Sequence, residues 1–411
     1  MEGWISDILE KAEGPASCGL CDRCLGRMFG KAGAAMTNDV RGRMIREGLA
    51  ESGKGCPAPA SCGLCEGVFD LLDRFAAAVA ESVNAVRSDN FLVGTRVEPE
   101  IAERERAIWE RFGLDCAEPI KTELNREIGK LALPLVGRPP EFVNPQVVAC
   151  IDTRFADVTL DIAPIFIAGR YLKHSREIPQ TIWPCRACKG KGCPRCKGAG
   201  KMYWTSVQEI IGDIALEMSG GEGHVFHGMG REDIDARMLG DGRPFVLEVR
   251  SPKVRDIDLD ELGRRANGSD LAGFSRLRFV PRAAVQEYKG AEPDKTYRAR
   301  VKAEGKVNKE RLDGVALSFE GVCIEQRTPR RVEHRRADLV RRRRVLWVEA
   351  EMAGDDEFDL TLCAEAGTYV KEFVSGDEGR TAPSFSEALG VRCAVLTLDV
   401  IAIDYQEPEK D

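Results

Sequence analysis

Four separate Cys-x-x-Cys pairs use eight of the 15 cysteines, and this spacing suits thiolate ligands of a metal ion better than a disulfide framework. Two of the pairs follow each other directly in PCRACKGKGCPRCKGAGK, whose glycines let the backbone fold around a sulfur cage. The pairs Cys21/Cys24 and Cys62/Cys65 could close a second site, with Cys18 and Cys56 as alternative ligands. For the tandem pairs, redox-active cysteines are the competing interpretation. We predict two structural zinc ions, held by Cys21, Cys24, Cys62 and Cys65 and by Cys185, Cys188, Cys193 and Cys196.

The segment GREDIDARMLGDGRPF, residues 230–245, combines carboxylates and arginines in a loop bounded by glycines. A loop of this kind can hold Asp233 against an arginine, which keeps the acid ionised at neutral pH. An ionised and oriented aspartate is a nucleophile or a base. The competing interpretation is a surface ion pair in a turn, and the residues of this segment alone do not decide between the two.

Basic residues are concentrated in QRTPRRVEHRRADLVRRRRV, which carries nine arginines between residues 327 and 344. Such a run is often only a solvated face. The whole chain has 60 Lys and Arg against 67 Asp and Glu, so a local concentration of bidentate donors is equipped to hold phosphates. Tyr297 in KTYRARV lies among cations and could stack on a base, or its ring could lie in the core.

The N-terminal half predicts helices and a small α/β module. Residues 1–84 are rich in Cys and Gly, with helical patterns at 40–49 and 68–83. From residue 90 to 180 we expect strands in FLVGTRV, VVACID and DVTLDI and a helix over the charged run 100–129. The segment 181–202 has almost no core-forming residues, so we expect a metal-bound knuckle there.

The C-terminal half predicts a large mixed or antiparallel sheet. Ser206 and Glu209 form a capping box ahead of a one-sided apolar helix. Strands are expected in PFVLEV, RLRFV, KTYRARVKA, VLWVEAEM and FDLTLCA. The fold class is therefore α+β with several domains. The acidic N-terminal segment has no signal-like apolar region and no apolar stretch is long enough to span a membrane, so we expect a cytoplasmic protein without membrane partners.

Three motifs, in family order, resemble those of pseudouridine synthases. GRED resembles the Arg-x-Asp loop of these enzymes, KTYRARV resembles their Lys-x-Tyr strand, and GTYVKEF resembles their Gly-Thr-Tyr-Ile-Arg/Lys motif. The segment YLKHSREIPQT resembles the close of a THUMP domain. Over essentially its full length, the chain looks like the archaeal-type tRNA pseudouridine synthases that modify the TΨC loop.

The resemblance implies a role for six residues. It makes Asp233 the essential aspartate and Tyr297 the aromatic residue that packs on the target uracil. It also implies that Lys371 is the basic partner of the aspartate, although many relatives have Arg there, and a lysine lacks the bidentate fork. The substrate-binding residues implied are Arg231, Tyr297, Val370, Lys371 and Leu398, with the two apolar residues as walls of the base pocket.

The resemblance also implies an organisation and partners. It divides the chain into a Cys-rich zinc-binding module (1–84), a THUMP-like RNA-binding domain (85–180), the knuckle (181–202) and the catalytic domain (203–411). The implied substrate is tRNA, modified in the TΨC loop at conventional position 55 and also at 54, and whether one or both of these uridines are modified stays open. The resemblance further implies structural zinc, no organic cofactor and no obligatory protein partner. Whether the aspartate attacks ribose C1′ or removes a sugar proton stays open.

Two other classes of function compete with this one. The tandem Cys-x-x-Cys-x-Gly-x-Gly repeat resembles the zinc modules of Hsp40 co-chaperones, which suggests a non-catalytic RNA-binding or chaperone-like protein. The chain lacks the His-Pro-Asp motif of those co-chaperones. A THUMP-bearing methyltransferase or thiolation enzyme would need a Gly-rich nucleotide loop or a pyrophosphate loop, and neither is visible in the sequence.

Overall fold

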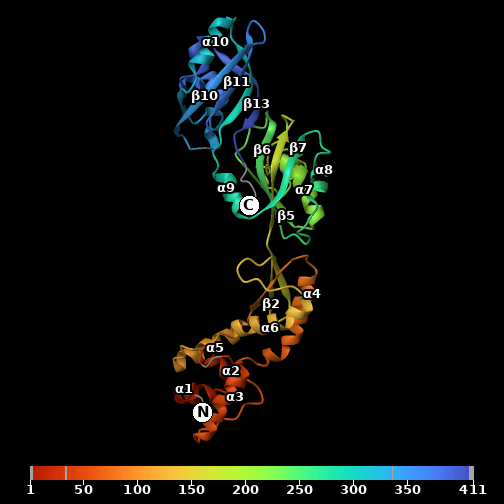
Figure 1. Ribbon diagram of the computed structural model, residues 1–411, viewed down its shortest axis with the longest axis vertical. Coiled ribbons are helices and arrows are strands. Elements are labelled where there is room, and N and C mark those ends of the chain that lie inside the picture. Colours follow the sequence, from red (N-terminus) through yellow and green to blue (C-terminus); the bar gives the residue numbers. More distant parts are fainter. Residues whose placement is uncertain (1–2, 33–34, 336, 407–411) are drawn as a thin grey trace. The chain divides into compact units, whose positions relative to one another are not determined.

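The computed structural model describes residues 3–32, 35–335 and 337–406 and divides into two compact units (Figure 1). Of these residues, unit 1 takes those up to 163 together with 253–255, and unit 2 takes the remainder. No helix among the described residues is both long enough and apolar enough to cross a membrane.

Unit 1 is mainly helical at its N-terminal end. Its helices are α1 (Gly3–Ala16), α2 (Asp22–Met28), α3 (Asn38–Glu51), the 3-10 turn η1 (Val68–Leu71), α4 (Leu72–Asn84), α5 (Pro99–Phe112) and α6 (Ile120–Val136). The charged run that we expected to form one helix is divided into α5 and α6. Gly113 ends α5 in a left-handed conformation with φ of 59°, and Pro119 caps the start of α6.

A three-stranded sheet completes unit 1 in the order β1 (Leu92–Arg96), β2 (Val147–Asp152) and β3 (Val158–Ile162). The β1–β2 pair is parallel and the β2–β3 pair is antiparallel. All three strands coincide with the alternating segments expected from the sequence. Their buried residues share one hydrophobic core with the helices, and Cys24, Cys62 and Cys65 belong to this core.

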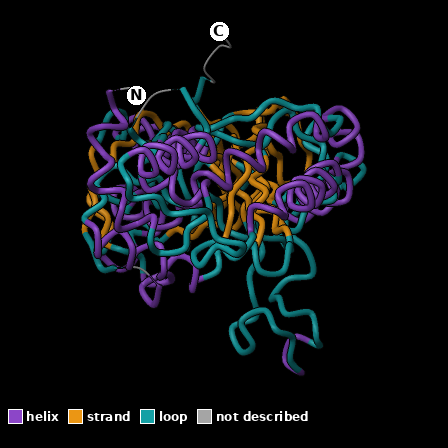
Figure 2. Tube along the Cα trace, turned by 90° about the horizontal axis from the view of Figure 1, so that it is seen from below, coloured by secondary structure: helices purple, strands orange, loops and turns teal. Residues whose placement is uncertain are grey.

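Unit 2 is built on a ten-stranded mixed sheet, whose strands are orange in Figure 2. The strands are β4 (Ile165–Lys173), β5 (Gly223–Gly228), β6 (Ala236–Arg250), β7 (Ala272–Val280), β8 (Lys295–Ala303), β9 (Cys323–Arg327), β10 (Val340–Met352), β11 (Glu357–Ala364), β12 (Thr381–Ala382) and β13 (Cys393–Ile403). Their order is β12-β9-β10-β11-β8-β13-β6-β4-β7, and β5 pairs with β6. Only the β13–β6 pair is parallel among the described strands of this sheet, which confirms the expected mixed sheet.

Helices of unit 2 connect and flank this sheet. They are α7 (Val207–Ser219), α8 (Leu259–Ala266), α9 (Ala283–Gly290), α10 (Lys309–Ser318), α11 (Val370–Ser375), α12 (Phe385–Leu389) and the 3-10 turns η2 (Pro194–Cys196), η3 (Arg330–Arg335) and η4 (Asp377–Gly379). The Ser206 side chain accepts a hydrogen bond from the Glu209 amide at 3.2 Å, as expected for the start of α7.

The segment YLKHSREIPQT begins inside β4, which lies between β6 and β7 in the sheet of unit 2. The resemblance places this segment at the close of the preceding domain, whereas in the structure it belongs to unit 2. The physical reason is burial. Residues 165–171 are all buried, as in a central strand covered on both faces, so the chain enters unit 2 at residue 164.

Candidate functional site

A cavity of about 280 Å³ opens in unit 2 where the parallel pair β6 and β13 meets β8. Its lining comes from the loop that precedes β6 (residues 230–235, the GRED loop), from β6, β8 and β13, from η3 and from the start of α11. All six predicted substrate-site residues line this one cavity: Arg231, Asp233, Tyr297, Val370, Lys371 and Leu398.

Two cationic side chains, one buried and one half-buried, hold the GRED loop by its backbone. Lys173, which is fully buried, donates from Nζ to the carbonyl oxygens of Ile234 at 2.7 Å and Asp233 at 3.2 Å. Burial lowers the pKa of Lys173 to about 8. Arg176 donates to the Asp235 carbonyl at 2.8 Å and to the Leu398 carbonyl at 2.7 Å, which ties the loop to β13. The Asp233 side chain is therefore presented from a fixed backbone.

The side chain of Glu232, in the GRED loop, belongs to a buried polar cluster. Its carboxylate accepts from Arg243 Nε at 3.0 Å and from the Tyr171 hydroxyl at 2.8 Å. The side chains of Glu232 and Arg243 are each only 1% exposed. Gln180 donates to the Tyr171 oxygen at 2.7 Å and to the Gly230 carbonyl at 3.0 Å, so this cluster also fixes the start of the loop.

Asp233 pairs with Arg331, whose Nη1 lies 2.7 Å from Asp233 Oδ2. The expected pair with Lys371 is not formed, because Lys371 Nζ lies 2.6 Å from Asp235 Oδ2 instead. Arg331 also reaches Glu372, with Nε 2.6 Å from Oε1. One guanidinium fork bridges two carboxylates in this way, which the single ammonium of a lysine does less well. This pairing holds the Asp233 carboxylate in place where it lines the cavity.

Lys295 and Tyr297 project from the same face of β8 into the cavity, as i and i+2 residues of a strand do. Tyr297 is 8% exposed, and burial raises its pKa to about 12. Burial, together with the charge of Arg243, lowers the pKa of Lys295 to about 8. The Tyr297 ring is therefore buried, as in the core interpretation, and it also lines the cavity. Lys295 and Arg331 were missed as site residues, although the first stands in the Lys-x-Tyr motif and the second in the arginine run.

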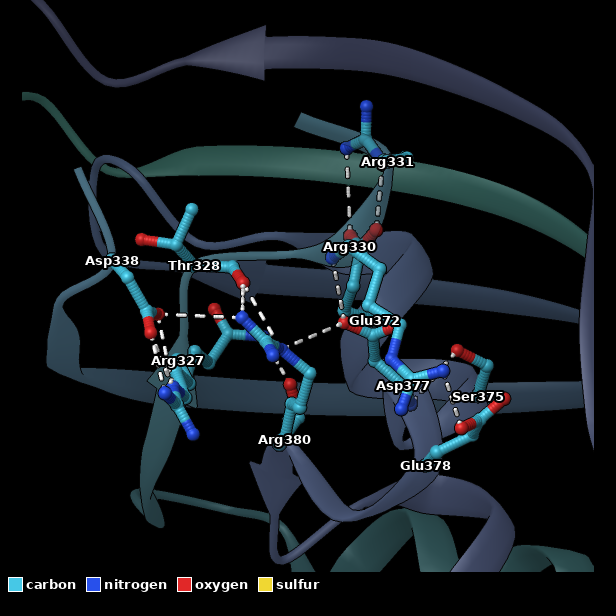
Figure 3. A network of polar contacts seen from close by, with 12 residues as sticks. Arg327, Thr328, Arg330, Arg331, Asp338, Glu372, Ser375, Asp377, Glu378 and Arg380 are labelled. Atoms are coloured by element: carbon cyan, nitrogen blue, oxygen red, sulfur yellow. Dashed lines mark hydrogen bonds and ion pairs between the residues drawn. The ribbon is translucent and has the colours of Figure 1, made fainter. Parts of the chain in front are cut away.

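The first part of the arginine run contacts α11 through Arg331 and η4 through Arg330 (Figure 3). Arg327 Nε lies 2.8 Å from Asp338 Oδ2, and Arg380 Nη2 donates to the Thr328 carbonyl at 2.6 Å. The Arg330 amide donates to Asp377 Oδ2 at 3.1 Å. These contacts fix η3 and hence Arg331 beside Asp233. One arginine of the run, Arg336, lies outside the described residues.

The eight predicted metal ligands form two groups, and within each group all four Sγ atoms lie within 4.8 Å of one another. A tetrahedral ion with metal–sulfur bonds of about 2.3 Å requires sulfur–sulfur distances of about 3.8 Å. The measured distances are 3.9 Å for Cys21–Cys65 and, in the knuckle, 3.9 Å for Cys185–Cys193 and 3.8 Å for Cys188–Cys196. Both groups therefore fit a tetrahedral ion.

The two alternative ligands lie outside these groups. The Cys18 thiol donates to the Gly14 carbonyl at 3.6 Å, and the Cys56 thiol donates to the Ala16 carbonyl at 3.1 Å. In the knuckle, the amides of Cys193 and Gly200 each donate to Cys196 Sγ at 3.2 Å. Such N–H···S bonds stabilise thiolate ligands.

Comparison with known proteins places both units in one family. Residues 166–404 match the model described as Pus10, C-terminal, and residues 75–152 match the Pus10 THUMP domain, archaeal. The chain is similar to the tRNA pseudouridine synthase Pus10 of Methanothrix thermoacetophila, with 40% identity over 93% of this chain and 91% of the relative. It is 40% identical to that of Methanopyrus kandleri, over 93% and 94%, and 43% identical to that of Methanothermobacter marburgensis, over 93% and 95%.

Proposed function

Because the chain belongs to the Pus10 family of tRNA pseudouridine synthases, we propose that it modifies the TΨC loop, at conventional position 55 and also at 54, with Asp233 as its catalytic residue. The observation that supports this proposal is the cavity itself. It brings Asp233 together with Tyr297 and Leu398 from segments far apart in the sequence. A carboxylate, an aromatic ring and an apolar wall suit a planar uracil with its ribose C1′ beside the acid.

Pseudouridine formation breaks the bond between uracil N1 and ribose C1′, rotates the base and joins C1′ to uracil C5, from which a proton leaves. The ribose passes through an electron-poor C1′, as in glycoside cleavage. Asp233 either attacks C1′ and is displaced when C5 bonds to it, or takes a sugar proton and returns it when the new bond forms. Both routes require an ionised carboxylate, and the Arg331 guanidinium lies 2.7 Å from it.

The other predicted site residues of the cavity have proposed roles in holding the nucleotide. The Tyr297 ring packs on the uracil, and Val370 and Leu398 form the apolar walls. Lys371 and Arg231 lie at the cavity edge, where they are placed to bind phosphate or ribose oxygens. A uridine within a folded tRNA loop must be extruded to reach this cavity, which costs a few kcal/mol of stacking and pairing that these contacts offset.

The direct test is to incubate the protein with a uridine-labelled tRNA transcript and map pseudouridine by carbodiimide primer extension. We expect stops that correspond to positions 55 and 54, and a transcript with cytidine at 55 should lose the first of them. A protein that binds the transcript but leaves both uridines unmodified would contradict the proposed function.

We further propose that both cysteine groups hold zinc, because thiolates at these distances suit that ion. Elemental analysis of reduced protein should return about two zinc ions per chain, from one ion for each set of four thiolates. Cys185→Ser should remove one ion and unfold the knuckle locally, since that segment has no core of its own. Cys56→Ser is the matched control and should keep both ions. Iron, or less than one zinc ion per chain, would count against this assignment.

The arginine run supplies a proposed grip on the tRNA backbone. Charge reversal of residues 341–344 should weaken tRNA binding and reduce its dependence on salt. The slope of log affinity against log salt should become smaller by about 0.7–0.9 for each phosphate that is no longer bound. Arg264→Glu is the control, because this arginine is exposed on α8 in the same unit. The binding curves can be measured by filter retention over a series of salt concentrations. An unchanged slope would show that the run is only a solvated face.

A further inference from the structure

The knuckle, taken here as residues 181–204, has a surface that the proposed chemistry does not use. This segment contains six Lys and Arg and no Asp or Glu. Lys201 pairs with Glu209 of α7. The other five are exposed, and none of them forms an ion pair within the part of the chain that the structure describes: Arg186, Lys189, Lys191, Arg195 and Lys197. Four thiolates around a divalent ion carry two negative charges, so the metal-bound knuckle stays strongly positive.

A hollow of about 310 Å³ lies between these cations and an exposed aromatic side chain. Trp204 is 65% exposed and Met202 is 41% exposed, and both line the hollow together with Arg195 and Lys197. Tyr203 also lines it and is held by an edge contact with Trp183, with ring centroids 5.7 Å apart. An exposed indole beside cations in an acidic protein is the combination that stacks on a nucleobase while binding its phosphates.

The knuckle, which belongs to unit 2, begins directly beside the GRED loop. Gln180, the residue before the knuckle, donates to the Gly230 carbonyl at 3.0 Å. At its other end, the knuckle returns to the body at Ser206, the cap of α7. An RNA whose uridine enters the cavity therefore passes close to the base of the knuckle.

We propose that the knuckle is a second RNA-binding surface, in which Trp204 stacks on an unpaired base of the substrate tRNA while Lys189, Arg195 and Lys197 bind its phosphates. The proposal rests on the proposed function, since tRNA is taken as the RNA. An acidic peptide would form ion pairs with the cations but would leave the exposed indole of Trp204 without a stacking partner. For that reason RNA is the better fit, and peptide binding becomes an outcome of the test.

The backbone of the knuckle offers a substitution that removes charge without harming the fold. Lys189 and Lys197 occupy equivalent positions of the two Cys-x-x-Cys-x-Gly-x-Gly repeats, and both have a left-handed backbone, with φ of 52° and 51°. Glycine adopts this conformation more readily than lysine. The two repeats also pack tightly through glycine, because a Cβ on Gly200 would lie 2.5 Å from the Gly190 carbonyl oxygen. Lys189→Gly with Lys197→Gly should therefore keep the fold and the zinc content.

The experiment measures the affinity of the full-length protein for a tRNA transcript by filter retention at several salt concentrations. The double lysine variant should bind more weakly, with a slope of log affinity against log salt smaller by about 1.4–1.8. Trp204→Ala should raise Kd roughly 5- to 150-fold with the salt slope unchanged, which separates stacking from charge. Lys306→Gly, which removes a charge at an exposed loop of the same unit, is the control and should bind as the wild type does.

Three outcomes decide the matter. Wild-type affinity and slope in both knuckle variants would overturn the proposal, and so would normal tRNA binding with weakened binding to a polyglutamate peptide. Weaker tRNA binding with two zinc ions retained supports it. The proposed function is tested separately, because pseudouridine mapping of the wild-type protein does not depend on the knuckle variants. Knuckle variants that bind normally, beside a wild type that forms pseudouridine, would remove this inference alone.

Discussion

Asp233→Asn is expected to abolish pseudouridine formation, by at least about a thousand-fold in rate, while folding and tRNA binding survive. The amide keeps the shape of the side chain, but it removes the charge that attacks C1′ or takes the sugar proton. Water cannot replace a carboxylate that is fixed by the GRED loop and paired with Arg331 at 2.7 Å. The rate can be followed by tritium release, because the C5 hydrogen of uracil leaves when C5 bonds to C1′.

Two aspartates of the same segment serve as controls. Asp235 pairs with Lys371 and its side chain is 65% exposed, so Asp235→Asn should retain measurable activity. Asp241 is exposed within β6 and does not line the cavity, so Asp241→Asn should act at nearly the wild-type rate. If Asp233→Asn works near the wild-type rate while Asp235→Asn does not, the catalytic residue has been misassigned. If none of these substitutions matters, the GRED loop is only a structural turn.

The sequence predicts much of the fold where apolar residues alternate. KTYRARVKA coincides with β8, and its buried residues alternate along the strand as the pattern requires. Strand β10 begins at Val340, before the expected VLWVEAEM, because four successive arginines hide the strand period. The central strand β13 was not among the expected strands, although CAVLTLDVIAI is largely apolar. Because apolar residues occupy both faces of this strand, its sequence shows little alternation and resembles that of a buried helix.

The site was predictable as a set of residues but not as a set of pairs. Motif resemblance brought Asp233, Tyr297 and Leu398 together, and all three line the cavity. The prediction that Lys371 pairs with Asp233 was wrong. The partner is Arg331, which reaches Asp233 only when η3 folds against α11. Nothing in the spacing of GREDIDAR distinguishes a buried carboxylate from an exposed one. That distinction depends on Arg243, which lies within β6 and pairs with the buried Glu232 carboxylate.

Breaking the buried Glu232–Arg243 pair should therefore have the largest effect on stability. Both side chains are 1% exposed, and the pair distance is 3.0 Å. Glu232→Gln keeps the volume but leaves the Arg243 charge buried without a counter-ion, which costs about 3–5 kcal/mol. For a unit of this size, that corresponds to a melting temperature lower by roughly 6–20 °C. Circular dichroism on heating measures the shift.

A matched exposed pair and a double variant show whether the cost comes from the buried charge. Asp355 pairs with Lys306 at 2.8 Å with both side chains largely in solvent, so Asp355→Asn should cost less than about 1 kcal/mol. Glu232→Gln with Arg243→Met removes both buried charges and should cost less than the two single substitutions together. A melting temperature unchanged by Glu232→Gln would show that water reaches the pair. Because Glu232 directly precedes Asp233, activity below the melting temperature should fall as well, since the GRED loop would lose the anchor that orients its carboxylate.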